Sequence, residues 1–297
     1  MATASGTSSL LRRARRVSLA DILAHMILLL LTAICLLPVV WVMVSSLKGR
    51  KELYLTLPPQ LWVHKPTLDN YRWILTKVPE IPLQLRNSFI ITIASMALRT
   101  FVATLGGYAF ARMRFRGRDA ILLSIVVAMF IPRAGGLMAQ YELLEKLHLR
   151  NTFLGLILHF ASGQSIPLFI MRQTFLAVPL ELEDAARIDG ASPFQLFWKI
   201  AMPMCTGGIL VVAIMSFVWV WGDFLFTYTM LDHPEMFTIA IGVARYSGHA
   251  ASLAVEDVAG YGAECAGYTL SMVPVIIMFI ALQKWFIRGL SEGILKL

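Results

Sequence analysis

Six long apolar segments constrain the fold of this chain more than any other feature. They cover residues 20–46, 87–111, 119–140, 151–176, 203–230 and 262–283. A helix of about 20 apolar residues crosses the hydrocarbon core of a bilayer, so each segment is long enough to span one. Only 15% of the 297 residues are charged, whereas soluble domains carry about 25%. The sequence therefore predicts an all-α, polytopic membrane protein with about six transmembrane helices.

The third apolar segment, 119–140, differs from the other five. Its apolar core ends at Ile131 and is followed by Pro132 and Arg133. Proline lacks a backbone donor and interrupts a helix. We therefore expect this span to be kinked or to line a cavity.

The positions of Lys and Arg predict the orientation of the spans. Arginines are dense in the N-terminal tail, 1–19, and in the short loop 112–118, whereas basic residues of the opposite side are diluted over long loops. This pattern favours a cytoplasmic N-terminus and C-terminus, with 20–297 as one transmembrane domain. Topology also explains the net charge of +8, so we expect contact with membrane lipid and no nucleic-acid partner. The cysteines lack the spacing of a metal site.

The polar stretch 179–203, between the fourth and fifth apolar segments, contains the clearest local pattern. Pro179 followed by Glu181 and Glu183 predicts a helix start, because acids are favourable near the positive end of the helix dipole. Gly190 stands where a left-handed residue would end that helix.

A second helix is predicted directly after this glycine. Ser192 and Pro193 have the residue types of an N-cap and a first helical position. An apolar stripe follows at Phe194, Phe197, Trp198 and Ala201. The stretch is thus expected to form a helix–glycine–helix elbow at the cytoplasmic membrane surface. On spacing alone, an interfacial amphipathic helix without a partner fits equally well.

Residues 183–191, Glu-Asp-Ala-Ala-Arg-Ile-Asp-Gly-Ala, closely resemble the EAA loop of permease subunits of bacterial ATP-binding-cassette (ABC) importers. The form Ala-Arg-Ile-Asp-Gly-Ala is most similar to permeases for carbohydrates, the group that includes the smaller maltose-transporter permease. Shorter similarities extend along most of the chain, at Asn87-Ser88, Tyr108-Ala109, Ala111-Arg112, Phe115-Arg116-Gly117, Asn151-Thr152 and Phe286-Ile287-Arg288-Gly289-Leu290. The nine-residue match is specific, whereas the dipeptides alone would be weak.

The resemblance implies a permease domain in the bacterial inner membrane, working with other proteins. These are a second permease subunit in a heterodimer, a cytoplasmic ATPase dimer that uses ATP and Mg²⁺, and an extracytoplasmic solute-binding protein. The permease itself would bind no cofactor. Its coupling helix would dock on the ATPase through Glu183, Asp184, Ala185, Ala186, Asp189 and Gly190. Asp184 replaces the usual Glu of the motif, so either Asp184 or Glu183 would offer the charge.

The chain is expected to be a transport subunit and not an enzyme, because it has no Gly-x-x-x-x-Gly-Lys-[Ser/Thr] phosphate loop and no hydrolase motif. An ion-coupled secondary transporter remains an alternative, although paired broken helices and proton relays are not visible. A second alternative is an ABC permease for another solute, such as a polyol or a glycerophosphodiester.

Ionisable residues within spans are costly and are therefore candidates for function. They are Arg99, Arg133, His159 and Asp223. The segment Trp221-Gly222-Asp223-Phe224 resembles the Trp-Asn-Glu-Phe segment of the permease family, and a carboxylate beside aromatic rings could contact a sugar. Arg133, Trp221 and Asp223 are thus the candidates for the substrate path. The alternatives are an interfacial aromatic belt around Asp223, an Arg133 that snorkels outward, and a site held by the partner permease.

Overall fold

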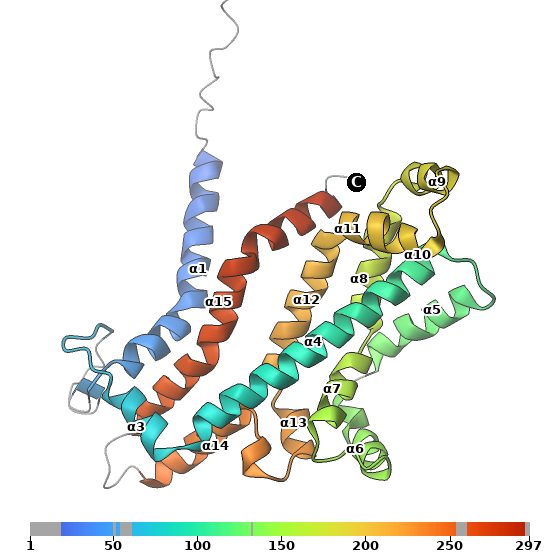
Figure 1. The fold of residues 1–297 in the computed structure, drawn as a ribbon. Helices are drawn as coiled ribbons and strands as arrows, with labels where there is room; N and C mark the ends of the chain where they lie inside the picture. The colour runs from blue at the N-terminus through green and yellow to red at the C-terminus, as the bar shows by residue number, and fades with distance from the viewer. Residues whose placement is uncertain (1–18, 50–51, 54–60, 132, 254–259, 295–297) are drawn as a thin grey trace, which may run out of the picture.

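The computed structural model describes residues 19–49, 52–53, 61–131, 133–253 and 260–294, and every regular element in this part of the chain is a helix (Figure 1). Within it, three single helices are long and apolar enough to cross a membrane. They are α1 (Leu19–Ser46), α4 (Glu80–Arg112) and α15 (Gly260–Ile294). The predicted all-α membrane architecture is confirmed.

Two further spans are bent pairs of helices. In the first, α7 (Phe153–Ser162) meets α8 (Ser165–Leu176) at 49°. In the second, the segment Pro193–Met204 meets α12 (Thr206–Trp221) at 74°. Counting each pair once gives up to five spans among the described residues. The predicted fifth span, 203–230, is therefore wrong as one helix, because α12 ends at Trp221 and α13 (Leu225–Met230) begins after a break.

The predicted third span, 119–140, is also not one helix. It is divided into α5 (Arg118–Val127), the 3₁₀ turns η1 (Ala128–Phe130) and η2 (Arg133–Gly136), and α6 (Leu137–Lys146). Ile131 has an extended backbone, with φ −78° and ψ 119°, as expected of a residue that precedes a proline. The predicted kink is confirmed, and it is sharp enough to end the helix.

The predicted loops contain helices as well. The loop 47–86 includes α3 (Asp69–Lys77) and the first turns of α4. The loop 231–261 includes η4 (Pro234–Met236) and α14 (Ile239–Leu253), which packs against α4 and α15. The spacing of apolar residues in these short polar segments does not distinguish a helix from a loop. The acidic residues Glu256 and Asp257 of that loop lie outside the described residues.

Helix α4 lies at the centre of the bundle and packs against α7, α8 and α12. Small residues allow this close packing, as is usual between membrane helices. A Cβ added to Gly107 would lie 2.5 Å from the Cβ of Met171 in α8. Glycine is therefore required where α4 and α8 meet.

The ends of the elements separate into two groups (Figure 1). The start of α1, the end of α4, the helix α9 (Leu180–Ile188) and the end of α15 lie at one end of the bundle. Helices α3, α6 and α14 lie at the other end. The predicted orientation, with both termini and the elbow in the cytoplasm, requires this separation.

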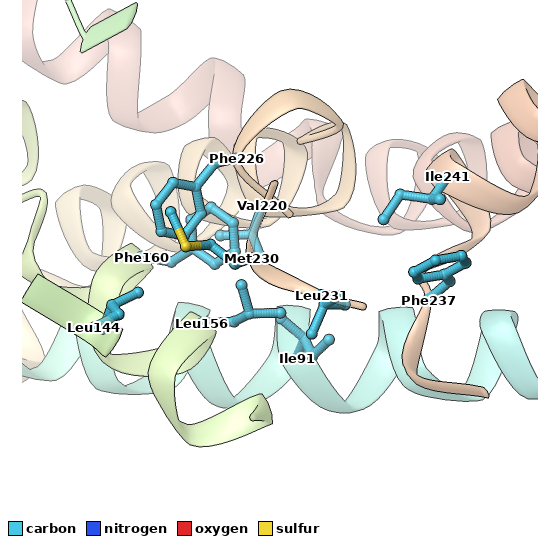
Figure 2. Packing of buried hydrophobic residues seen from close by; sticks show 10 residues of the cluster. All are labelled: Ile91, Leu144, Leu156, Phe160, Val220, Phe226, Met230, Leu231, Phe237 and Ile241. Carbon is cyan, nitrogen blue, oxygen red and sulfur yellow. The ribbon is translucent and has the colours of Figure 1, made fainter. Parts of the chain in front are cut away.

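A cluster of buried apolar side chains joins several helices of the bundle (Figure 2). Its members are Ile91, Leu144, Leu156, Phe160, Val220, Phe226, Met230, Leu231, Phe237 and Ile241. The side chains of α4, α6, α7, α12, α13 and α14 meet there. The cluster fixes the positions of Phe160 and Phe226, which also line the cavity described below.

Candidate functional site

The predicted elbow is present, at the end of the bundle where α4 and α15 end. Helix α9 ends with Asp189 as its C-cap, and Gly190 follows with φ +84°. The N–H of Gly190 donates to the carbonyl of Arg187 at 3.0 Å, and that of Ala191 donates to the carbonyl of Ala186 at 2.9 Å. These two bonds are the Schellman pattern that glycine permits at a helix end.

The second helix of the elbow begins as predicted but winds differently. Ser192 caps α10 (Pro193–Gln195) in a capping box: its side chain accepts from the N–H of Gln195, and its own N–H donates to the side chain of Gln195. The chain then forms a π-helix, η3 (Leu196–Ala201), followed by α11 (Met202–Met204). The wider π turns change which residues face inward. Of the predicted stripe, Phe197 and Ala201 are buried, whereas Phe194 and Trp198 are exposed.

The two neighbouring acids of α9 have opposite environments. Glu183 is 1% exposed, and its Oε1 accepts a hydrogen bond from Nε of Arg112 at 2.7 Å. Asp184 is exposed and lies 3.6 Å from Nη1 of Arg187. Asp184 is thus the acid available to a docking protein, and Glu183 is turned toward α4. The sequence alone did not indicate which of these two acids is buried and which is exposed.

Several apolar side chains of the elbow are exposed. Leu182, Ile188 and Phe194 are all exposed, Ile188 to 87%. Ala185 is exposed and Ala186 is partly buried. Apolar and acidic side chains are thus both exposed on the elbow.

A cavity of about 310 Å³ lies between α4, α6, α7, α8 and α12. Its polar lining comes from Arg99, Gln140, His159, Ser162, Ser165 and Asp223. Its aromatic lining comes from Phe160, Trp219 and Phe226. Ala128, Met129 and Ile131 also line it, so the broken third span borders the cavity as predicted.

Two ionisable groups of the cavity are held by defined contacts. Nη2 of Arg99 donates to the carbonyl of Gly163 at 2.6 Å, and its guanidinium lies 4.6 Å from the centre of the Trp219 ring. Arg99 is buried and turned toward the bundle interior. The imidazole of His159 stacks on Phe226, with ring centres 3.5 Å apart.

Asp223 borders the cavity, whereas Trp221 does not. Oδ1 of Asp223 accepts hydrogen bonds from the N–H and the hydroxyl of Thr227, at 2.9 and 2.8 Å, and so caps α13. Trp221 is 4% exposed, donates to the carbonyl of Ser271 at 3.0 Å and stacks on Phe217. Trp221 is therefore a core residue. The side chain of Arg133 lies outside the described residues.

The tryptophan that lines the cavity is Trp219, which the sequence interpretation missed. Trp219 precedes Asp223 by four residues, and residues four apart would share one face of the single helix that the sequence predicts over 203–230. Trp221, two residues before Asp223, points to another face. Helical spacing was therefore a signal that could have identified Trp219.

At the end of the bundle opposite α9, polar contacts join segments that are far apart in sequence. Nδ2 of Asn87 donates to the carbonyls of Glu235 and Phe237, at 2.7 and 3.1 Å. Arg150 pairs with Asp232 at 2.7 Å and also with Glu145. These hydrogen bonds, first to Asp232 and then to Glu145, raise the pKa of the Arg150 guanidinium above its usual value.

Comparisons with known proteins agree with this geometry. Residues 88–292 match the family described as "Binding-protein-dependent transport system inner membrane component". The chain is 31% identical to a sulfoquinovosyl glycerol transport system permease protein of Agrobacterium fabrum, over 88% of this chain and 89% of that protein. It is 34% identical to an arabinooligosaccharides transport system permease protein of Halalkalibacterium halodurans, over 77% and 80% respectively.

A solved structure has the same fold. It is a chain of a bacterial ABC transporter involved in the import of the acidic polysaccharide alginate, with a TM-score of 0.80 and 19% identity. The similarity covers 92% of this chain and 98% of that one. With the family match over most of the length and the bent spans around α4, the chain belongs to the family of multi-pass inner membrane components of binding-protein-dependent transport systems.

Proposed function

We propose that this chain is one of two permease subunits of an ABC importer for a carbohydrate. The observation that carries the proposal is the elbow, which exposes Asp184 and several apolar side chains at the end of the bundle that is predicted to be cytoplasmic. This is where a separate ATPase dimer would dock. The names of the relatives, which transport a sulfoquinovosyl glycerol and arabinooligosaccharides, support a carbohydrate as the solute.

Transport by this subunit would be a change in conformational populations and not a chemical reaction. ATP and Mg²⁺ would be used by the ATPase, and this chain would hold no cofactor. Closure of the ATPase dimer would move α9, and the permease pair would alternate between outward-facing and inward-facing states. An extracytoplasmic binding protein would deliver the solute. An ion-coupled secondary transporter is disfavoured, because the family is defined by binding-protein-dependent transport.

The cavity supports a carbohydrate or a similar polyhydroxylated solute. Its volume is at the low end of the usual range for small-molecule sites, about 300–1,000 Å³. Trp219 and Phe160 would stack on the C–H faces of a sugar ring, and Asp223 and Gln140 would bond to hydroxyl groups. A polyol or a glycerophosphodiester could use the same polar groups, so the solute class needs a direct test.

The test is uptake by the complex reconstituted in proteoliposomes with its partner permease, ATPase and binding protein. Radiolabelled mono-, di- and trisaccharides, a polyol and a glycerophosphodiester would be compared. We expect ATP-dependent uptake of a saccharide, reduced by Trp219→Ala and unchanged by Asp119→Asn, a control on the exposed surface of α5. Uptake of the polyol or the glycerophosphodiester alone would refute the carbohydrate assignment, and uptake without the ATPase would refute the whole proposal.

A further inference from the structure

The coupling helix α9 packs against η3 and places one buried side chain against the end of α4. The structure describes all nine residues of α9, and among them only Glu183 is buried. The exposed residues of the helix include Leu180, Leu182 and Ile188. An isolated amphipathic helix would instead bury an apolar face. The contact of α9 with the bundle is therefore unusual, because its buried group is a carboxylate.

Arg112 holds this carboxylate from the last turn of α4. Nε of Arg112 donates to Oε1 of Glu183 at 2.7 Å, and Nη2 donates to the carbonyl of Val178 at 2.6 Å. The two side chains are 6% and 1% exposed. Oε2 of Glu183 is buried and accepts no hydrogen bond from the described residues. A buried carboxylate with one unsatisfied oxygen depends on its cation, so loss of either partner disrupts the contact.

Arg112 belongs to the central helix of the bundle. Helix α4 meets α8 at Gly107, and α8 continues through Val178 into α9. The chain therefore joins α8 to α9 on one side, and the Arg112–Glu183 pair joins α9 to α4 on the other. The Arg112–Glu183 pair therefore opposes a rotation of α9 alone, because such a rotation would break this buried contact.

The same helix connects this contact to the cavity. Arg99, which lines the cavity, precedes Arg112 by 13 residues in α4. At 1.5 Å per residue, the two arginines are about 20 Å apart along the helix axis. A displacement of α9 that is transmitted to Arg112 would therefore move the cavity wall.

We propose that the Arg112–Glu183 pair transmits the movement of the coupling helix to α4 and through it to the cavity. Arg112 and Glu183 are positioning residues, and neither contacts the solute. The inference rests on the proposed function, since it assumes that an ATPase moves α9. It adds a different role for Glu183, which connects α9 to the membrane domain while Asp184 and the alanines face the ATPase.

The experiment compares three measurements on the reconstituted complex: co-purification of the ATPase subunit, ATP hydrolysis stimulated by the binding protein, and saccharide taken up per ATP hydrolysed. In Glu183→Gln and Arg112→Lys, we expect the ATPase to remain bound and ATP hydrolysis to continue. Uptake per ATP is expected to fall about tenfold, within the range of ordinary allosteric couplings. A purely structural role would lower all three measurements together.

The charge-swapped variant, Arg112→Glu with Glu183→Arg, is expected to recover part of the coupling lost in either single swap. Asp119→Asn, which disrupts the exposed pair with Arg118, is the matched control and should leave uptake per ATP unchanged. Where Glu183→Gln fails to assemble, Arg112→Lys supplies the same comparison. Unchanged uptake per ATP in Arg112→Lys overturns the inference.

The docking role of the elbow has a separate test on the outer face of α9. Asp184→Lys and Ala185→Trp are expected to weaken co-purification of the ATPase. If both leave ATPase binding and uptake intact, the outer face of α9 is not the docking surface, whereas uptake without the ATPase is the result that refutes the proposed function. If they abolish binding while Glu183→Gln leaves uptake per ATP unchanged, only the role of the Arg112–Glu183 pair is refuted.

Discussion

Replacing Gly190 by alanine tests how the backbone geometry of the elbow affects saccharide uptake per ATP hydrolysed. The φ of +84° at Gly190 costs a residue with a Cβ roughly 1–2 kcal/mol. No atom lies within 4 Å of a Cβ built there, so the cost is backbone strain alone. A free energy of this size changes an equilibrium by a factor of about 5 to 30. Gly190→Ala should therefore shift the population of elbow conformations by this factor, away from those with a positive φ at residue 190.

Gly117 provides a matched control. Its φ is +83° and its surroundings are equally open, but it begins α5 and lies outside the elbow. Because the strain is the same, Gly190→Ala and Gly117→Ala should lower the Tm of the purified complex equally. Only Gly190→Ala should lower saccharide uptake per ATP. Gly190→Asn should retain most of the coupling, since asparagine tolerates the left-handed conformation.

The assay is uptake and ATP hydrolysis in proteoliposomes, with Tm measured on the same preparations. Equal loss of uptake per ATP in the Gly117 and Gly190 variants would refute the reasoning, because strain anywhere near the cytoplasmic surface would then suffice. Full coupling in Gly190→Ala, together with the expected loss of Tm, would show that the elbow need not keep this geometry.

Three further comparisons address packing, the cavity and its charge. Gly107→Ala places a Cβ against Met171 and is expected to destabilise the complex by about 1–3 kcal/mol, measured as a lower Tm; an unchanged Tm would contradict the close packing of α4 on α8. Trp219→Ala should raise the solute concentration for half-maximal uptake with little change in Tm. Trp221→Ala should instead lower the free energy of unfolding by about 3–5 kcal/mol. The reverse pattern would mean that Trp221 lines the solute site and Trp219 belongs to the core. Asp223→Asn retains an oxygen that can cap α13, so Tm should hold while uptake falls; a loss of Tm alone would make Asp223 a structural cap.

The elbow could be predicted because its signals are local. Gly190, Ser192 and Pro193 each require a particular backbone conformation, and the structure has all three as expected. The π-helix that follows could not be predicted in this way. It depends on how Phe197 and Ala201 pack against the bundle.

The contacts that define the candidate site are long-range, and composition does not reveal them. Arg112 and Glu183 are 71 positions apart in sequence, and Asn87 and Phe237 are 150 apart. A single sequence gives no information on such pairs. Trp219 was missed for another reason, because its spacing from Asp223 was visible but the neighbouring Trp221 resembled a family segment more closely.

Helix α1 contacts the rest of this chain mainly through its last turns. Trp41 donates to the hydroxyl of Tyr261 at 2.7 Å, and Ser45 and Ser46 are buried, whereas the apolar side chains before them are exposed. Exchange of one aliphatic residue for another in the first turns of α1 should therefore have little effect on the stability of this chain. These side chains are exposed, so the fold of the chain requires only that they be apolar. Homologous proteins should differ most in the first half of this helix and least at its end.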